Sequence, residues 1–369
     1  IGEIVPNLIN CQDRYSFIDE DGIMFRVALS LSVGISSLFA ILIGEASAQG
    51  LKIPLPEVTQ PRLLLMDGPD FFVVDGADGT SILVHSLDDF ELQMRLGGTG
   101  DDPGLFRVRP GHRVGLDVTE TNIIVTGGRK VSFFSRDGEL QKEIPFSFWT
   151  HWDFKAVPDG LVAVVADSTD YSHRLTRFDS NLQNPREILR VPNPVAPEGG
   201  AINVLSSSLQ FTVSGNEIYV WGHTPEPKID LFDRSGTPIR SISYDYQRIP
   251  VTEEIKSLVR ESYSSHPVFA EDSLEIINRL AFPEHLPAIW TCFVDSGQLY
   301  VMTYWRDGPL GELMVFDRDG EPGGSLHVPI QLSGSQEVLP AQILRGTWYQ
   351  IIRDEPGGLW KLGILGGSR

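Results

Sequence analysis

A short phrase that recurs along the chain constrains its fold more than any other sequence feature. Each copy is a β-prone run with an aromatic residue, followed by a polar turn that ends in glycine. The clearest copies span residues 131–138, 229–236 and 313–320. Recurrence of one such unit is typical of repeat proteins, in which each unit buries its faces by stacking on its neighbours. The sequence therefore predicts an array of small sheets.

Six residues mark the same position in successive units. They are His85, Phe134, Phe178, Phe232, Phe316 and Leu362. Most of the intervals between them fit one four-stranded blade of about 40 to 50 residues. Each marker follows a segment rich in β-branched and aromatic residues that is bounded by Gly, Asp or Asn, as expected of strands. We therefore predict an all-β fold, a six-bladed β-propeller.

The interval between the fourth and fifth markers is too long for one blade and contains the helix signals. Thr252 is placed to cap a helix, with acidic residues in the first turn. Apolar residues then follow at helical spacing: Ile255, Leu258 and Val259. A second helix is expected over 271–280, with Leu274, Ile277 and Asn278 on one side. We predict a small helical insertion over residues 250–287, which caps a sheet edge or forms a lid or partner surface.

The two ends of the chain are expected to close the ring. Residues 359–365 run close to the C-terminus and leave no room for a further outer strand. Residues 51–55 can supply the missing strand, and their Pro54 suits an edge position because proline cannot donate to a ladder. We predict that the last blade borrows its outermost strand from the beginning of the propeller.

A secretory signal peptide is predicted over residues 24–48. Met24 and Arg26 precede an apolar run over 27–43, and Ala46-Ser47-Ala48 forms a small-residue cleavage site. Cleavage after Ala48 leaves residues 49–369 as the mature propeller, which we expect to be secreted or periplasmic and outside the membrane. An uncleaved anchor is the alternative, although the run is short of the roughly 20 residues of a comfortable span. Residues 1–23 are interpreted as an upstream extension that is not part of the mature protein.

Charge and cysteine content limit the classes of partner and the source of stability. The net charge of −19 disfavours binding to nucleic acid or anionic membranes, which depends on clustered Lys and Arg. Of the two cysteines, Cys11 precedes the signal peptide, so Cys292 has no partner and the core must supply the stability. Cys292 lies in an apolar run and is predicted to be a small buried hydrophobe. We expect a monomer.

Several phrases resemble NHL-repeat proteins. Residues 96–106 match the glycine-rich linker with a Pro-Gly-x-Phe ending that joins NHL blades, and the turn at 316–320 resembles the outer hairpins of that family. The helical insertion and residues 353–362 are similar to exported bacterial six-bladed propellers, most of which have no assigned activity. The resemblance covers about residues 60–365. It implies a fold and a location, and no reaction, because propellers host many unrelated functions.

Propellers usually bind ligands at the mouth of the central channel, so residues that end the second strands are the candidates for a site. They are Asp75, Arg129, Asp167, His223, Arg306 and Arg353, with Asp354 beside the last. Guanidinium and carboxylate groups around one mouth can hold a carboxylate, a phosphate or a sugar. The same groups can instead pair with one another between blades.

Aromatic and histidine residues add two further hypotheses. Trp149 and a second tryptophan flank His151, which predicts either a stacking platform for a sugar or aromatic group, or packing between blades. The same two alternatives apply to residues 304–307. Histidines from successive blades are weak metal candidates: His151, His173 and His223, with Asp153, Asp167 and Asp170 near them in sequence. No local metal-binding motif supports them.

Two function hypotheses remain from the sequence. No nucleophile elbow, phosphate-binding loop or dinucleotide fingerprint occurs, so no catalytic residue is named. The first hypothesis is an exported module that binds a small molecule or a protein through the channel mouth and has no cofactor. The second is a metal-assisted lyase or hydrolase, lactonase-like or NHL-lyase-like, that uses Ca or Zn on the same scaffold.

Overall fold

The computed structural model describes residues 50–76, 79–108, 113–167, 172–192, 200–205, 208–265, 273–332 and 338–366. Within these ranges the side chains of eight residues are outside the description: Trp149, His151, Trp152, Asp153, Asp167, Ser262, Ser265 and Ser273. The predicted signal peptide over 24–48 and the extension over 1–23 also lie outside the described residues.

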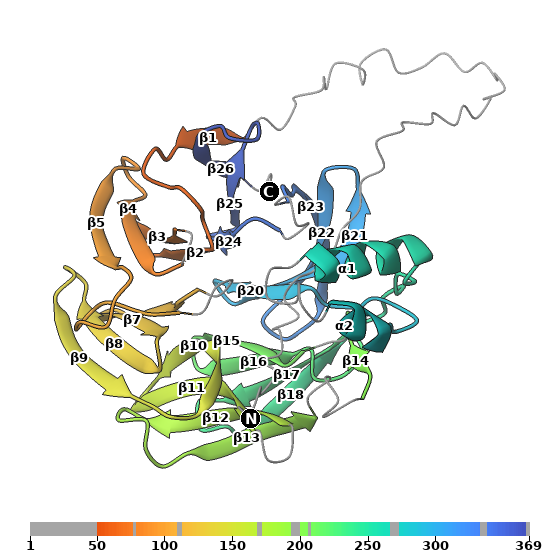
Figure 1. Cartoon of the computed structure of the whole chain (residues 1–369), viewed down its shortest axis with the longest axis horizontal. Coiled ribbons are helices and arrows are strands. Elements are labelled where there is room, and N and C mark those ends of the chain that lie inside the picture. Colours follow the sequence, from red (N-terminus) through yellow and green to blue (C-terminus); the bar gives the residue numbers. More distant parts are fainter. Residues whose placement is uncertain are drawn as a thin grey trace.

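Six antiparallel four-stranded sheets surround a common axis within the described residues (Figure 1). Blade 1 consists of β2 (Leu63–Asp67), β3 (Asp70–Asp75), β4 (Ser81–Ser86) and β5 (Leu92–Gly97). Blade 2 consists of β6 (Gly115–Val118), β7 (Asn122–Gly127), β8 (Lys130–Ser135) and β9 (Leu140–Pro145). Blade 3 consists of β10 (Trp149–Val157), β11 (Gly160–Asp167), β12 (Ser172–Asp179) and β13 (Arg186–Pro192).

The second half of the ring repeats this arrangement. Blade 4 consists of β15 (Gln210–Ser214), β16 (Glu217–Trp221), β17 (Lys228–Asp233) and β18 (Pro238–Ser243). Blade 5 consists of β20 (Thr291–Asp295), β21 (Gln298–Asp307), β22 (Leu310–Phe316) and β23 (Pro322–Pro329). Blade 6 consists of β24 (Ala341–Leu344), β25 (Thr347–Arg353), β26 (Trp360–Gly366) and β1 (Leu51–Pro54). The predicted six-bladed propeller is confirmed.

The repeated marker of the sequence corresponds to one structural position. All six markers lie on the third strand of a blade and are buried: His85, Phe134, Phe178, Phe232, Phe316 and Leu362. The third strand has a sheet neighbour on both sides and adjacent blades over both faces, so a large side chain there is removed from water. The 3.3 Å contact between His85 Nδ1 and the Phe90 carbonyl satisfies one polar atom of the single non-apolar marker.

The glycine-rich linker between blades 1 and 2 is shaped around a buried phenylalanine. Phe106 is fully buried, and its amide donates to the Gly98 carbonyl at 2.8 Å. Gly97 has φ of +72°, and a Cβ there would lie 2.4 Å from the Thr80 carbonyl oxygen. Both the positive φ and the close approach require glycine, which explains this part of the linker pattern.

The two ends of the propeller are joined in blade 6. Strand β1 pairs antiparallel with β26, with Leu51 opposite Ile364 and Pro54 opposite Lys361. The fully buried Leu55 follows β1, and its amide donates to the Trp360 carbonyl at 2.8 Å. The prediction that residues 51–55 complete the last blade is confirmed.

The insertion between blades 4 and 5 contains helices α1 (Glu253–Ser265) and α2 (Ser273–Arg279). The Thr252 hydroxyl accepts a hydrogen bond from the Ile255 amide at 3.3 Å, so Thr252 is the predicted N-cap. Ile255 and Val259 are buried in a cluster that includes Trp290 and other residues of blade 5. Figure 1 shows both helices on one side of the ring.

The structure differs from the sequence prediction at α2. Helical spacing placed Leu274 and Ile277 on one side of this helix, but 76% of Leu274 is exposed, whereas Ile276 and Ile277 pack against the blade 5 cluster. The strand β19 (Leu280–Ala281) follows α2 directly and pairs in parallel with β14 (Ile202–Asn203). This pairing fixes which side of the short helix faces the core.

Cys292 is 6% exposed and lies in the hydrophobic cluster between blades 4 and 5, which confirms that it is a small buried hydrophobe. Among the helices of the described residues, none has the length and apolarity that crossing a bilayer would require.

Ring closure can be tested with a disulfide across β1 and β26. In a chain that begins at Gln49 and carries Cys292→Ala, the double substitution Leu51→Cys and Ile364→Cys places two thiols on directly paired residues. Because the bridge would close nearly the whole chain into a loop, oxidation should raise stability by about 2–4 kcal/mol. Thermal unfolding with and without reductant measures this. Leu51→Cys alone is the control, and failure of the pair to oxidise would contradict the closure.

Two buried histidines predict a loss of stability in mild acid. Burial lowers the pKa of His173 to about 4 and also lowers the pKa of His85. The unfolded chain therefore binds these protons more readily than the folded protein does. Stability should be full above about pH 6.5 and fall as the pH drops toward 4, by up to about 3 kcal/mol for His173.

Urea unfolding at pH 7.0 and pH 4.5 measures this difference. The variant His173→Gln removes one titrating group and should show a smaller pH dependence than the unsubstituted protein. The variant His327→Gln, at an exposed position in β23, is the matched control and should keep the full dependence. If the stability of both variants depends equally on pH, the loss of stability in acid does not come from His173, and the prediction is wrong.

Candidate functional site

A cavity of about 1030 Å³ lies on the axis of the ring. Five of the six innermost strands contribute to its wall: Leu63 and Leu64 from β2, Lys155 from β10, Gln210–Thr212 from β15, Thr291–Phe293 from β20, and Ala341 and Gln342 from β24. Arg113, which precedes the sixth innermost strand, β6, also lines it. A cavity of this size can enclose a small organic ligand.

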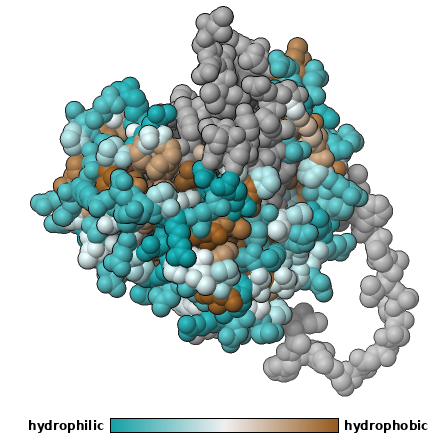
Figure 2. All heavy atoms as spheres, turned by 90° about the horizontal axis from the view of Figure 1, so that it is seen from below, coloured by the Kyte–Doolittle hydropathy of each residue, from teal (hydrophilic) through white to brown (hydrophobic). Residues whose placement is uncertain are grey.

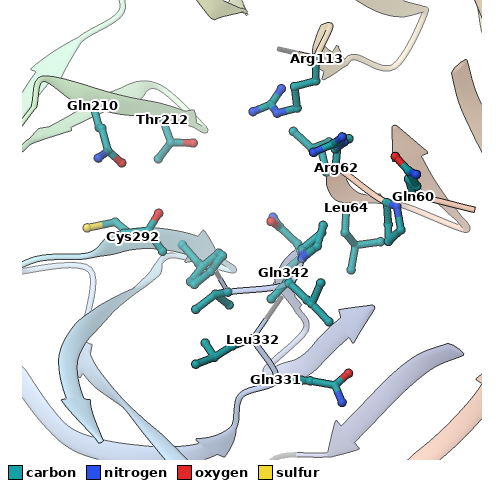
Figure 3. A pocket seen from close by; sticks show the side chains of 18 of the residues that line it. Gln60, Arg62, Leu64, Arg113, Gln210, Thr212, Cys292, Gln331, Leu332 and Gln342 are labelled. Carbon is teal, nitrogen blue, oxygen red and sulfur yellow. The ribbon is translucent and has the colours of Figure 1, made fainter. Parts of the chain in front are cut away.

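Basic side chains dominate the charged part of this wall. Among the described residues the lining contains four bases, Arg62, Arg113, Lys155 and Arg353, and two acids, Asp354 and Glu355. Figure 3 shows Arg62 and Arg113 extending into the same space from neighbouring segments. This local excess of positive charge stands within a chain of net charge −19. Such a concavity raises the local concentration of anions.

Two of the bases are held by neighbouring groups. Arg113 donates from Nη1 to the Val114 carbonyl at 2.9 Å. Lys155 Nζ lies 3.2 Å from Asp117 Oδ1, and Asp117 also accepts from the Ala156 amide at 2.7 Å. Lys155 therefore joins blade 3 to blade 2 as an ion pair.

Arg353 enters the cavity from the end of β25 and was predicted from the sequence. Its guanidinium lies 4.6 Å from the centroid of the Trp360 ring. The Gln331 side chain accepts from the Arg353 amide and donates to the Arg353 carbonyl, which fixes the backbone at this point. Hydrogen bonds from Lys361 and Lys52 lower the pKa of the adjacent Asp354 to about 2. Asp354 therefore forms ion pairs with two lysines and is not the counter-ion of Arg353.

Asp75 positions part of the wall without lining it. The side chain is 4% exposed and accepts hydrogen bonds from the Thr59 amide at 3.0 Å, the Thr59 hydroxyl at 2.8 Å and the Gln60 amide at 2.7 Å. The segment held in this way leads into β2 and contributes Thr59, Gln60 and Arg62 to the cavity. Asp75 is thus a positioning residue for one corner of the site.

Three other sequence candidates lie away from the cavity wall. Arg129 is exposed in the β7–β8 turn, with φ of +63°. His223 Nε2 lies 2.7 Å from Asp230 Oδ2 within blade 4. The guanidinium of Arg306 lies 4.7 Å from the Trp290 ring centroid, and burial lowers the pKa of Arg306 to about 10. The structure therefore does not bring these three side chains together.

The remaining candidates concern the platform and metal hypotheses. Trp149 and His151 lie on β10 and Asp167 ends β11, but their side chains are outside the described part of the molecule. His173 is buried on β12, opposite Ala166 and Val191, within the body of blade 3. Among the residues that the structure describes, no group of three or more His, Cys, Asp or Glu side chains is placed to hold a metal ion.

The sequence analysis missed Arg62 and Arg113 because it searched the ends of the second strands. In this ring the cavity is formed mainly by the innermost strands and by residues that directly precede them. Arg62 stands one residue before the innermost strand of blade 1, and Arg113 stands two residues before the innermost strand of blade 2. When the two blades are aligned on their strand registers, Arg62 matches Val114 and Arg113 matches Pro61, so the repeat pattern does not pair the two arginines.

Comparison with known proteins supports the fold alone. No protein-family model matches the sequence, and no curated protein matches it. A solved structure of a DUF4221 family member from Bacteroides vulgatus is similar, with a TM-score of 0.52, 11% identity, and coverage of 85% of this chain and 95% of that chain.

Two further solved structures match with a TM-score of 0.39. They are the β-propeller domain of Myceliophteria thermophila Cps50 (Swd1), at 13% identity over 85% of this chain and 98% of that one, and a Bacteroides caccae protein of unknown function, at 10% identity over 77% and 83%. The chain is a β-propeller.

Proposed function

We propose that the protein is an exported binding module that takes a small organic anion into its axial cavity. The observation that carries this proposal is the presence of Arg62, Arg113 and Arg353, from three blades, on the wall of one cavity in an acidic chain. Arginine offers paired donors that match carboxylate and phosphate oxygens, and its charge persists at all physiological pH values. A concave and partly enclosed site strengthens that attraction.

The outer surface gives less support for a protein partner. On the face shown in Figure 2, hydrophilic residues cover most of the described surface, and hydrophobic residues form small separate patches. Of the most exposed large apolar side chains, Leu51 lies on β1, Leu274 on α2 and Leu359 in the connection that precedes β26. Docking surfaces are usually marked by one larger apolar patch. The cavity is therefore the better supported binding site.

Amide groups on the wall complement the arginines. Gln60, which precedes Arg62 by two residues, and Gln342, on the strand β24 that contacts β2, both line the cavity (Figure 3). Side-chain amides can donate to further oxygens of an anion or accept from a hydroxyl group of the ligand. Asp75 holds the backbone from which Gln60 and Arg62 project, so the geometry of this corner is fixed before a ligand enters.

The proposal predicts that Arg113→Gln weakens binding of the anion. A thermal-shift screen of carboxylates and phosphates identifies a ligand, and titration calorimetry then compares the variants. Because Gln keeps polarity and loses the charge, affinity should fall at least about tenfold, which corresponds to about 1.4 kcal/mol. Arg186→Gln, at an exposed position that begins the outermost strand β13, is the matched control and should bind as the unsubstituted protein does.

Two results would contradict the proposal. One is that no carboxylate or phosphate in the screen stabilises the protein. The other is that Arg113→Gln and Arg186→Gln change the affinity for the anion to the same extent.

Export predicts a defined mature terminus. When the chain from Met24 is expressed in a bacterium with a periplasm, the exported product should begin at Gln49, as intact mass and N-terminal sequencing would show. Ala48→Arg replaces the small residue that the cleavage site needs, so the precursor should accumulate. A cytoplasmic product that keeps Met24 in the unsubstituted chain would contradict export.

A further inference from the structure

Among the residues that the structure describes, the charged side chains of the cavity wall are confined to part of its circumference. Blades 1, 2 and 3 contribute Arg62, Arg113 and Lys155, and blade 6 contributes Arg353 with its acidic neighbours. Along the chain from Val164 to Gln342, every described lining residue is uncharged. The described lining residues of blades 4 and 5 and of the linker after blade 5 therefore form a neutral wall.

Much of the neutral wall is apolar and accessible. Phe211 from β15 and Phe293 from β20 line the cavity and are only partly buried. Phe293 is held edge-on to Trp348, with ring centroids 5.7 Å apart and an interplanar angle of 88°. Leu332 adds an aliphatic side chain. Apolar surface left in contact with water in a concave site favours the binding of an apolar group.

The two kinds of wall face each other across the cavity. Figure 3 shows Arg62 and Arg113 on one side, and Thr212, Cys292 and Leu332 across from them. A ligand that spans the space therefore meets positive charge at one end and neutral, largely apolar groups at the other. A second charge at the neutral end would lose hydration there without gaining a cationic partner.

We propose that the ligand is an amphiphilic anion, with a single carboxylate or phosphate group directed to Arg62 and Arg113 and an uncharged, largely apolar body against Phe211, Phe293 and Leu332. This inference rests on the proposed function and adds the class and orientation of the ligand. The cavity of about 1030 Å³ is also much larger than a compact anion requires. A small hydrophilic anion would leave the phenylalanine rings in water, whereas an aryl or alkyl body covers them.

The test compares anions of matched charge and different bodies by titration calorimetry. The apolar set is octanoate, dodecanoate, 3-phenylpropanoate and phenyl phosphate, and the hydrophilic set is acetate, succinate, citrate and inorganic phosphate. The best apolar anion should bind at least tenfold more tightly than every hydrophilic anion. Its neutral amide or alcohol analogue should bind at least tenfold more weakly than the anion itself.

Substitutions separate the two ends of the ligand. Phe211→Ser should lower the affinity for the best apolar anion at least fivefold and leave the affinity for hydrophilic anions unchanged. Arg113→Gln should lower the affinity for both sets of anions and leave the affinity for the neutral analogue unchanged. Leu332→Ser is a second variant of the neutral wall in case Phe211→Ser reduces thermal stability. Ile239→Ser, at a 46% exposed position on the outermost strand β18, is the matched control.

The outcomes distinguish this inference from the proposed function. If hydrophilic anions bind with dependence on Arg113 and as tightly as the apolar ones, the inference is wrong and the proposed function stands. If no anion of either set binds, both are wrong. If apolar anions bind to the Phe211→Ser and Leu332→Ser variants as tightly as to the unsubstituted protein, the apolar body of the ligand does not lie on the neutral wall. The inference is then wrong.

Discussion

The pairing of β1 with β26 is the interaction on which the rest of the structure depends. Each blade covers its faces with neighbouring blades, so an unclosed ring would leave the outer faces of the first and last blades in water. The closing pair is supported by the Lys52–Asp354 ion pair at 2.7 Å and by the Trp360 indole, which donates to the Thr59 carbonyl at 2.8 Å. Backbone pairing, an ion pair and an indole hydrogen bond therefore stabilise the closed ring together at the junction of β1 and β26.

Closure and the candidate site are physically continuous. The chain leaves β1, passes Thr59, which Asp75 holds, and delivers Arg62 to the cavity. On the other side of the same junction, Trp360 supports the guanidinium of Arg353, and Asp354 next to it is neutralised by two lysines. Contacts that complete the ring thus also place two of the cavity arginines.

The sequence predicted the elements of the fold that depend on local pattern. Repeated spacing indicated six blades, Thr252 indicated the start of α1, and the missing outer strand near the C-terminus indicated closure by residues 51–55. It was less informative about the site. Arg353 lines the cavity, but Asp75 binds backbone amides and His223 binds Asp230, because side chains at the ends of second strands often find partners inside their own blade or linker. The sequence also did not show which side of α2 is buried, because the distant pairing of β14 with β19 orients this short helix.

By itself, then, the amino-acid sequence determined the number of blades, the position of the helical insertion and the strand that closes the ring. These features follow from periodicity and from turn and cap residues, which act over a few neighbouring positions. Only the tertiary structure decided that Arg62, Arg113 and Arg353 share one cavity and that a neutral wall faces the first two. The reason is that radial closure brings residues far apart in the chain to a common axis, and no local pattern encodes the direction in which each innermost side chain points.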